Sequence, residues 1–193
     1  MGQKIKKMLI ANYGDNAIRI IRACKELGIE TVAIYTEEER SVLHTRLADV
    51  AICIGESNTV SCYSNVYNIL SAAEIAKVDA IHPGIRNGKD IINLVLMCEK
   101  IGYRFIGPDS RILKVMDNTI NGKLVAKSCG VPTLSDYTVI ISSATDAVEA
   151  GFNINFPVIM KSINTSEYSG RFYTSIPEIG NRRSDVKETA LPF

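Results

Sequence analysis

The order of hydrophobic and polar residues near the start of the chain predicts a strand, a turn and a helix. A short apolar run at 8–11 is followed by the turn residues Gly14 and Asp15. The next apolar residues are three or four positions apart, a spacing that places them on one face of a helix: Ala17, Ile20, Ile21, Cys24 and Leu27. A second run at 31–35 is continuously apolar, which is typical of a strand buried on both faces of a parallel sheet. Together these elements predict a βαβ unit with a right-handed crossover.

The same rhythm continues as far as residue 108. Apolar runs at 50–54, 79–82 and 104–106 predict strands, and helical spacing predicts helices at about 65–77 and 89–101. The polar segment 55–64 is expected to be a loop. Thr36 and Glu39 have capping-box spacing and predict a short helix that runs on to about residue 47. The alternation predicts an α/β fold, a doubly wound sheet of five parallel strands over residues 5–108, with helices on both faces.

Beyond residue 110 the pattern changes. Two helical stretches at 111–116 and 120–128 are followed by apolar segments at 137–141 and 157–161, with a helix expected between them near 144–150. Residues 162–193 show no clean periodicity and are expected to be partly loose, because they have little apolar surface to bury. We expect a first domain over residues 1–116 and a second region over 117–193.

Composition narrows the classes of partner. The 193 residues carry 22 basic and 21 acidic side chains, which gives no indication of a nucleic-acid partner. No apolar run approaches the ~20 residues of a membrane span, and the N-terminus lacks the apolar core of a signal peptide, so a cytoplasmic protein without a membrane partner is expected. The cysteines are odd in number and form no CxxC pair, which predicts free buried thiols in a reducing compartment. They are Cys24, Cys53, Cys62, Cys98 and Cys129.

The first turn invites comparison with dinucleotide-binding folds. Glu37 lies about twenty residues beyond the turn, where an acid can hold a ribose. The turn offers only Gly14, however, and the pattern GxGxxG is absent, so the backbone has no glycine-lined path to a pyrophosphate. We therefore favour the alternative that Glu37 belongs to the turn that begins at Thr36.

Few residues have the spacing of a chemical site. The chain has two histidines, His44 and His82, without metal-ligand spacing, and neither a metal site nor a catalytic residue is predicted. His82 comes just after a predicted strand, where α/β folds bind ligands, so it either lines a ligand site or caps the strand. Arg19, Arg22 and Glu26 lie on the helix face opposite the apolar stripe, and Arg22 can pair with Glu26. The simpler interpretation of this face is a solvated surface.

Five stretches in order between residues 5 and 161 carry a resemblance to a known family: IANYGDNAIRIIRACKELGIETVAIYTEEER, LADVAICIG, ILSAAEIAKVDAIHPG, FIGPDSRILKVM and AKSCGVP. They resemble the N-terminal part of biotin carboxylase, the ATP-grasp subunit or domain of acetyl-CoA, propionyl-CoA and pyruvate carboxylases. The resemblance implies a Rossmann-like domain followed here by an incomplete ATP-grasp lobe. It also implies the family's reaction, carboxylation of biotin by bicarbonate with ATP and magnesium.

The chain departs from the family's pattern at several positions. The family's ANRGEIA has an arginine where this chain has Tyr13, and of its HPGYGFLSEN only residues 82–84 remain. The lysine of its MGDK aligns with Thr119. Its phosphate-covering glycines are replaced by a segment that contains Glu167, whose charge would repel phosphate, and the bulky Tyr168. The family's magnesium-binding carboxylates and catalytic residues are expected beyond this chain, so no cofactor is expected for the chain alone.

Two sets of matching residues remain. Lys161 matches the strand lysine of the family's IIKAS and is either a nucleotide-binding residue or an inherited surface lysine. Arg19, Arg22 and Glu26 match a helix that takes part in the family's homodimer contact, which implies at most a weak symmetric dimer. Three functions stay open: a module without activity of its own, a partial biotin carboxylase subunit completed by another chain or other carboxylase subunits, and a nucleotide-sensing module.

Overall fold

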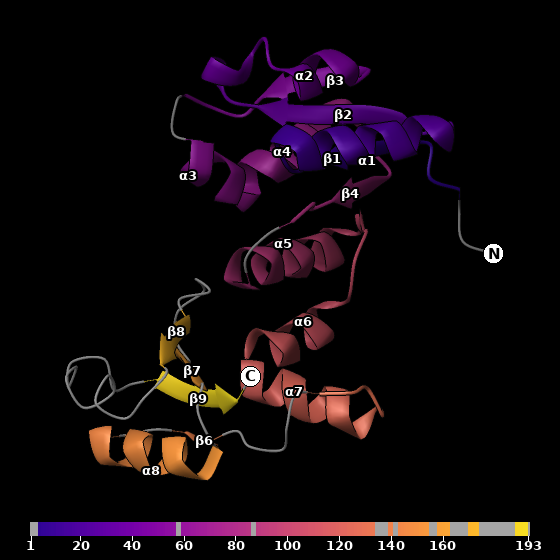
Figure 1. Ribbon diagram of the computed structural model, residues 1–193. Coiled ribbons are helices and arrows are strands. Elements are labelled where there is room, and N and C mark those ends of the chain that lie inside the picture. Colours follow the sequence, from indigo (N-terminus) through magenta and orange to yellow (C-terminus); the bar gives the residue numbers. More distant parts are fainter. Residues whose placement is uncertain are drawn as a thin grey trace. The chain divides into compact units, whose positions relative to one another are not determined.

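The computed structural model describes residues 4–56, 59–85, 88–133, 139–140, 143–154, 158–162, 170–173 and 188–192. The chain forms two compact units, Met1–Leu113 and Lys114–Phe193 (Figure 1). In the described part of the chain, the first unit has a five-stranded sheet and the second a four-stranded sheet.

The sheet of the first unit is parallel throughout, as the apolar runs predict. Its strands are β1 (Lys7–Ile10), β2 (Glu30–Tyr35), β3 (Val50–Cys53), β4 (Ala80–His82) and β5 (Arg104–Phe105), in the order β3-β2-β1-β4-β5. β1 is therefore central, with Ile10 beside Ala33 on one side and His82 on the other. The strand order reverses direction between β1 and β4, and ligands of open α/β sheets bind outside the carboxyl ends at such a point.

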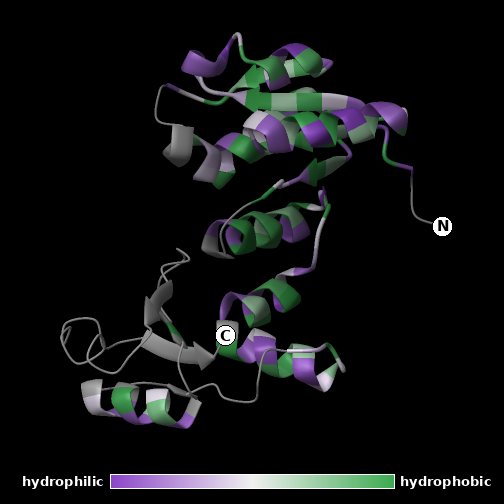
Figure 2. Ribbon diagram, in the orientation of Figure 1, coloured by the Kyte–Doolittle hydropathy of each residue, from purple (hydrophilic) through white to green (hydrophobic). Residues whose placement is uncertain are grey.

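Helices cover both faces of this sheet, as expected. They are α1 (Gly14–Glu26), η1 (Glu37–Glu39), α2 (Leu43–Leu47), α3 (Thr59–Ser64), α4 (Val66–Ala76) and α5 (Gly88–Ile101). Leu9 packs in a cluster with Leu70 of α4 and Leu94 of α5, whereas Ile10 packs with Ile21 of α1. Successive β1 residues thus face opposite cores, which is why the strand is apolar without alternation. Figure 2 shows hydrophobic positions along β2 and in stripes on the helices.

Two expectations for this unit are wrong in detail. The short helix expected between Thr36 and residue 47 is two pieces, η1 and α2, because Val42 is extended between them. The segment expected to be a loop contains α3. Asn65 separates α3 from α4, since its side chain accepts hydrogen bonds from the N–H groups of Tyr67 (3.0 Å) and Asn68 (3.2 Å) and so caps α4.

The second unit combines helices with an antiparallel sheet. α6 (Ser110–Asp117) contains the boundary between the units and is followed by α7 (Thr119–Ser128) and α8 (Ala144–Ile154). The strands are β6 (Val139–Ile140), β7 (Val158–Ser162), β8 (Gly170–Tyr173) and β9 (Glu188–Pro192), in the order β6-β9-β7-β8. Residues 162–193, which were expected to be partly loose, contain the strands β8 and β9. Both strands pair with β7, and local periodicity does not reveal pairing with another strand.

Candidate functional site

The loops after β1 and β4 meet at the carboxyl edge of the parallel sheet. Asn12 is 5% exposed and joins the two loops. Its Nδ2 donates to the carbonyl oxygens of Pro83 (3.1 Å) and Ile85 (2.9 Å), and its Oδ1 accepts from the N–H of Tyr13 (3.0 Å). Both donor hydrogens of the amide are therefore used inside the protein, and Asn12 fastens the edge instead of offering a donor to a ligand.

Gly84 fits tightly against Asn12. Its φ of +68° lies in the left-handed region, and a Cβ at this position would lie 2.3 Å from Asn12 Nδ2. Only glycine fits this position without movement of the asparagine. The retained His82-Pro83-Gly84 therefore has a structural explanation at this edge.

His82 lies at the carboxyl end of β4, where it was expected. Its carbonyl oxygen accepts from the N–H of Ala11 (2.9 Å), and its Nδ1 accepts from the N–H of Gly84 (3.0 Å). Burial lowers the pKa of the imidazole, so the ring is neutral at neutral pH with its proton on Nε2. These contacts support the interpretation that His82 caps the strand. A role of His82 in ligand binding stays a prediction.

An aromatic pair stands where the family has an arginine. Tyr13 is 44% exposed, and its ring centroid lies 4.8 Å from that of the buried Tyr63 in α3. The Tyr63 hydroxyl lies 3.0 Å from the carbonyl oxygen of Ile34 and 2.8 Å from Glu39 Oε2. Sequence patterns alone did not single out Tyr63, because α3 has no apolar periodicity. Tyr13 gives this edge an aromatic surface without the positive charge of a guanidinium.

The remaining histidine is structural. His44 is 1% exposed, and its Nε2 lies 3.3 Å from the carbonyl oxygen of Ile34. Burial lowers its pKa and outweighs the opposing effects of that carbonyl and of Glu39. The carboxylate of Glu39 accepts from the N–H (3.2 Å) and hydroxyl (3.0 Å) of Thr36, which confirms the predicted pairing of these two residues.

The residues matched to the family's dimer contact lie together on α1. Arg19, Arg22 and Glu26 are all exposed. Within the described residues, ion pairs join Lys7 to Glu30 and Arg111 to Asp109, each at 2.9 Å, and Arg22 and Glu26, which could pair by their spacing, form no ion pair. The three side chains form a solvated face in this single chain.

The residues matched to the family's nucleotide site belong to the second unit. Lys161 lies in β7, paired with Gly170 of β8 on one side and Thr189 of β9 on the other. Thr119 is the first residue of α7, directly after Asn118, whose side chain caps that helix. Glu167 and Tyr168 lie outside the described residues. The predicted role of Lys161 stays a prediction.

A pocket of about 350 Å³ lies in the first unit, at the amino ends of β1, β4 and β5 and not at the carboxyl edge. Charged side chains of both signs surround it, with two aromatic or sulfur groups and one glycine: Lys4, Asp79, Glu99, Arg104, Cys98, Tyr103 and Gly102. Asp79 Oδ2 accepts from the N–H groups of Lys6 (2.8 Å) and Lys7 (2.9 Å). These hydrogen bonds lower the pKa of Asp79 and fasten the segment that enters β1.

The described residues provide no metal site, membrane-spanning helix or disulfide. No group of three or more His, Cys, Asp or Glu side chains among the described residues could hold a metal ion. None of the helices described has the length and apolar character needed to cross a membrane. All five cysteines are free; Cys24 and Cys98 are buried, but Cys53 and Cys129 are exposed, so the expectation of buried thiols is wrong for those two.

Comparisons with known proteins agree on one family. The family described as "Biotin carboxylase, N-terminal domain" matches residues 4–113. Biotin carboxylase 1 of Bacillus subtilis is 41% identical over 158 residues, which are 82% of this chain and 35% of that protein. The biotin carboxylase of Haemophilus influenzae is 38% identical over 160 residues, 82% of this chain and 36% of that protein. The chain thus spans about a third of these relatives' length.

Solved structures agree in fold over nearly the whole chain. The biotin carboxylase of Campylobacter jejuni has a TM-score of 0.81 and 29% identity, over 97% of this chain and 44% of that one. The biotin carboxylase domain dimer of Hydrogenobacter thermophilus 2-oxoglutarate carboxylase, in complex with MgADP, ADP and bicarbonate, has a TM-score of 0.76 and 30% identity, over 98% and 44% of the two chains. The family match over residues 4–113 covers more than half of the chain, and the parallel five-stranded sheet agrees with it. The chain therefore belongs to the biotin carboxylase N-terminal domain family.

Proposed function

We propose that this chain is the N-terminal part of a biotin carboxylase fold and has no carboxylase activity on its own. The observation that carries the proposal is coverage, because 82% of this chain matches only 35% of the Bacillus subtilis relative. ATP, magnesium and biotin belong to the family's reaction, and by this proposal this chain alone does not complete a site for them. We also propose that the protein is cytoplasmic and that its first domain ends at residue 116 and its second region begins at residue 117.

The described residues support it through their chemistry. At the carboxyl edge, Asn12 is saturated by backbone groups and His82 is a neutral imidazole engaged by Gly84. Tyr13 has no positive charge, and neither has Thr119 in the position of the family's ATP lysine. Cationic side chains are strong partners of phosphate, and none of these four residues supplies one at neutral pH.

Titration of the purified chain with Mg-ATP, and an assay of biotin-dependent ATP hydrolysis in bicarbonate, test the proposal. We expect no turnover and no binding tighter than about millimolar, since a single retained lysine supplies little of the ~4 kcal/mol that such a constant represents. An intact biotin carboxylase is the positive control. A micromolar constant would instead favour the nucleotide-sensing function, and turnover by the chain alone would refute the proposal.

A second candidate is a partial subunit completed by another chain that carries the remaining ATP-grasp lobes. The retention of Lys161 favours it. If this candidate is right, mixing the two chains restores biotin-dependent ATP hydrolysis, and Lys161→Ala lowers it at least about ten-fold, as loss of a charged phosphate contact should. Lys114→Ala, at an exposed lysine of α6, is the matched control. Equal activity of the two variants would exclude a role for Lys161.

A further inference from the structure

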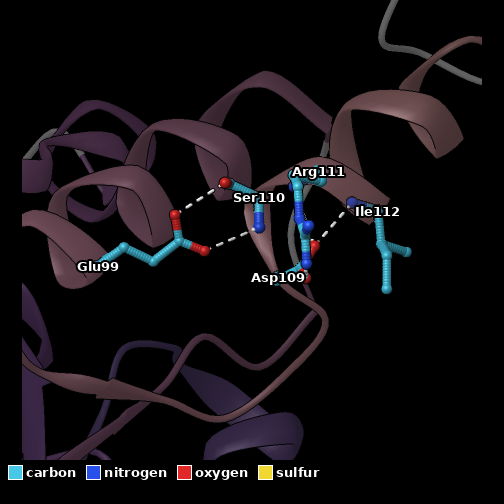
Figure 3. Close-up of polar contacts among 5 residues, drawn as sticks. All are labelled: Glu99, Asp109, Ser110, Arg111 and Ile112. Atoms are coloured by element: carbon cyan, nitrogen blue, oxygen red, sulfur yellow. Dashed lines mark hydrogen bonds and ion pairs between the residues drawn. The ribbon is translucent and has the colours of Figure 1, made fainter.

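Two carboxylates from different parts of the chain cap the first turn of α6 (Figure 3). Asp109 lies directly before the helix, and its Oδ1 accepts from the N–H groups of Arg111 (3.0 Å) and Ile112 (2.9 Å). Glu99 lies in the last turn of α5. Its Oε1 accepts from the N–H of Ser110 (3.0 Å), and its Oε2 accepts from the Ser110 hydroxyl (2.8 Å).

These contacts satisfy the whole start of the helix. The first four N–H groups of an α-helix have no partner within it. Here Ser110 donates to Glu99, and Arg111 and Ile112 donate to Asp109; the N–H of Leu113 then forms the first i→i−4 bond of the helix, to the carbonyl oxygen of Asp109 (3.1 Å). Negative charge at a helix N-terminus is also favourable for the helix dipole. Asp109 is a local cap, whereas Glu99 reaches α6 from another helix.

Apolar packing of α6 is weak by comparison. Ile112 is 52% exposed, Val115 39% and Met116 54%. Ser110 is the residue of α6 that is buried, at 7% exposed, and it is the one that Glu99 holds. A buried hydroxyl and N–H that lost this carboxylate would be left without their acceptors, which is costly. The contact between Glu99 and Ser110 is therefore the principal described attachment of the first turn of α6 to α5.

Glu99 is charged in this setting. The N–H and hydroxyl of Ser110 lower the pKa of the Glu99 carboxyl, against desolvation and the nearby Asp109. The other charged or titratable groups around Glu99 are Cys98 on the same helix, Tyr103 directly before β5, Arg104 in β5, Lys4, Asp79 and Arg111. The carboxylate is thus an acceptor of hydrogen bonds at neutral pH.

We propose that Glu99 is a latch that holds the first turn of α6 against the end of α5. α6 runs from Ser110 to Asp117, and its first turn, residues 110–113, belongs to the first unit, as Glu99 does. The latch needs two acceptor oxygens for the two donors of one residue. Glutamine at position 99 can accept from only one of the two donors of Ser110; its Nε2 can donate to the serine hydroxyl, but the charge-assisted hydrogen bonds and the negative charge at the helix N-terminus are lost.

A single fluorescent reporter tests the latch. The chain has no tryptophan, so Ile112→Trp places one on an exposed position of α6. In this background, Glu99→Gln and Ser110→Ala are compared with Lys100→Gln, which removes an exposed charge from the same turn of α5. We expect the two latch variants to lower the fluorescence anisotropy of the reporter. Hydrogen exchange at Arg111–Leu113 should become about ten-fold faster, with the amides of β1 and β2 unchanged.

Either of two results would overturn the latch. The latch variants could give the same anisotropy and hydrogen exchange as Lys100→Gln, or they could lose protection from hydrogen exchange equally in the amides of the sheet. The reporter protein without a latch substitution gives a second test if the variants do not fold. Because the folded pKa of Glu99 is lowered, the latch is complete above the ordinary carboxyl pKa of about 4.5 and opens as pH falls through the lower folded value. Reporter mobility should rise there before the circular dichroism of the sheet changes. Coincident transitions would mean that there is no separate latch.

Discussion

At the scale of single residues, the carboxyl edge depends on two that fit each other. Asn12 spans the loops after β1 and β4, and the backbone that it contacts turns through Gly84 with positive φ. The residue at either of these two positions therefore limits which residues fit at the other. The amide hydrogens of Asn12 are used within the protein and are not offered to a ligand.

Gly84→Ala is expected to destabilise the protein by more than its backbone conformation alone explains. The left-handed conformation costs a non-glycine residue about 1–2 kcal/mol, and the added Cβ would also displace Asn12. Gly102→Ala is the matched control, since Gly102 also has positive φ (+86°) but nothing within 4 Å of its Cβ position. Urea unfolding of the two variants should differ by at least about 1 kcal/mol. Equal values would show that the Asn12 contact has no energetic consequence.

At the scale of elements, side chains tie the strand ends together. Asp49, directly before β3, accepts from the N–H (2.8 Å) and the hydroxyl (2.6 Å) of Thr31 in β2. These hydrogen bonds lower the pKa of the Asp49 carboxyl. They fix the register of the edge strand β3 against β2 at its first residues.

The Asp49 contact should make stability depend on pH. Because the folded pKa is lowered, its contribution is complete above the unfolded value, near 3.8, and is lost as pH falls through the folded value. Asp49→Asn should therefore lower the free energy of unfolding at pH 7. At pH 2 the difference between this variant and the wild type should be small. Urea unfolding at both pH values measures this, with the exposed Glu38→Gln as control. A deficit that is the same at both pH values would contradict the assignment.

The sequence predicted elements well where the signal is local. The apolar runs of β1 to β5 and the stripe of α1 mark their own positions, and the family resemblance gave the correct α/β fold. Two features depend on contacts that a local pattern does not contain: α3, a short helix with the sequence TVSCYS whose Tyr63 is buried, and β8 and β9, which form by pairing with β7. The site was harder to predict. Sequence singled out His82, but Asn12 and Gly84 show their importance only through a contact across 72 positions, between 12 and 84.

At the scale of the whole molecule, self-association is expected to be weak. Exposed ion pairs contribute ~0–1 kcal/mol each, and a two-fold contact through Arg19, Arg22 and Glu26 duplicates such pairs without supplying an apolar centre. We expect sedimentation at rising concentration to show at most a weak dimer, and Arg19→Glu to abolish it. Lys25→Gln, on an exposed neighbouring position of the same helix, is the control. A chain that stays monomeric at high concentration, or an Arg19→Glu variant that dimerises equally well, would exclude this interface.

The central position of β1 has a consequence for the order of folding. β1 pairs with β2 within the first 33 residues, but its other partner places Met8 beside Ala80 and Ile10 beside His82. During synthesis, the second edge of β1 stays open until roughly seventy further residues have left the ribosome. Contacts so distant in sequence form late, and an unpaired apolar edge is a site for association with other chains. Nascent chains arrested before residue 80 should therefore need a chaperone, and chains arrested well beyond residue 106 should not.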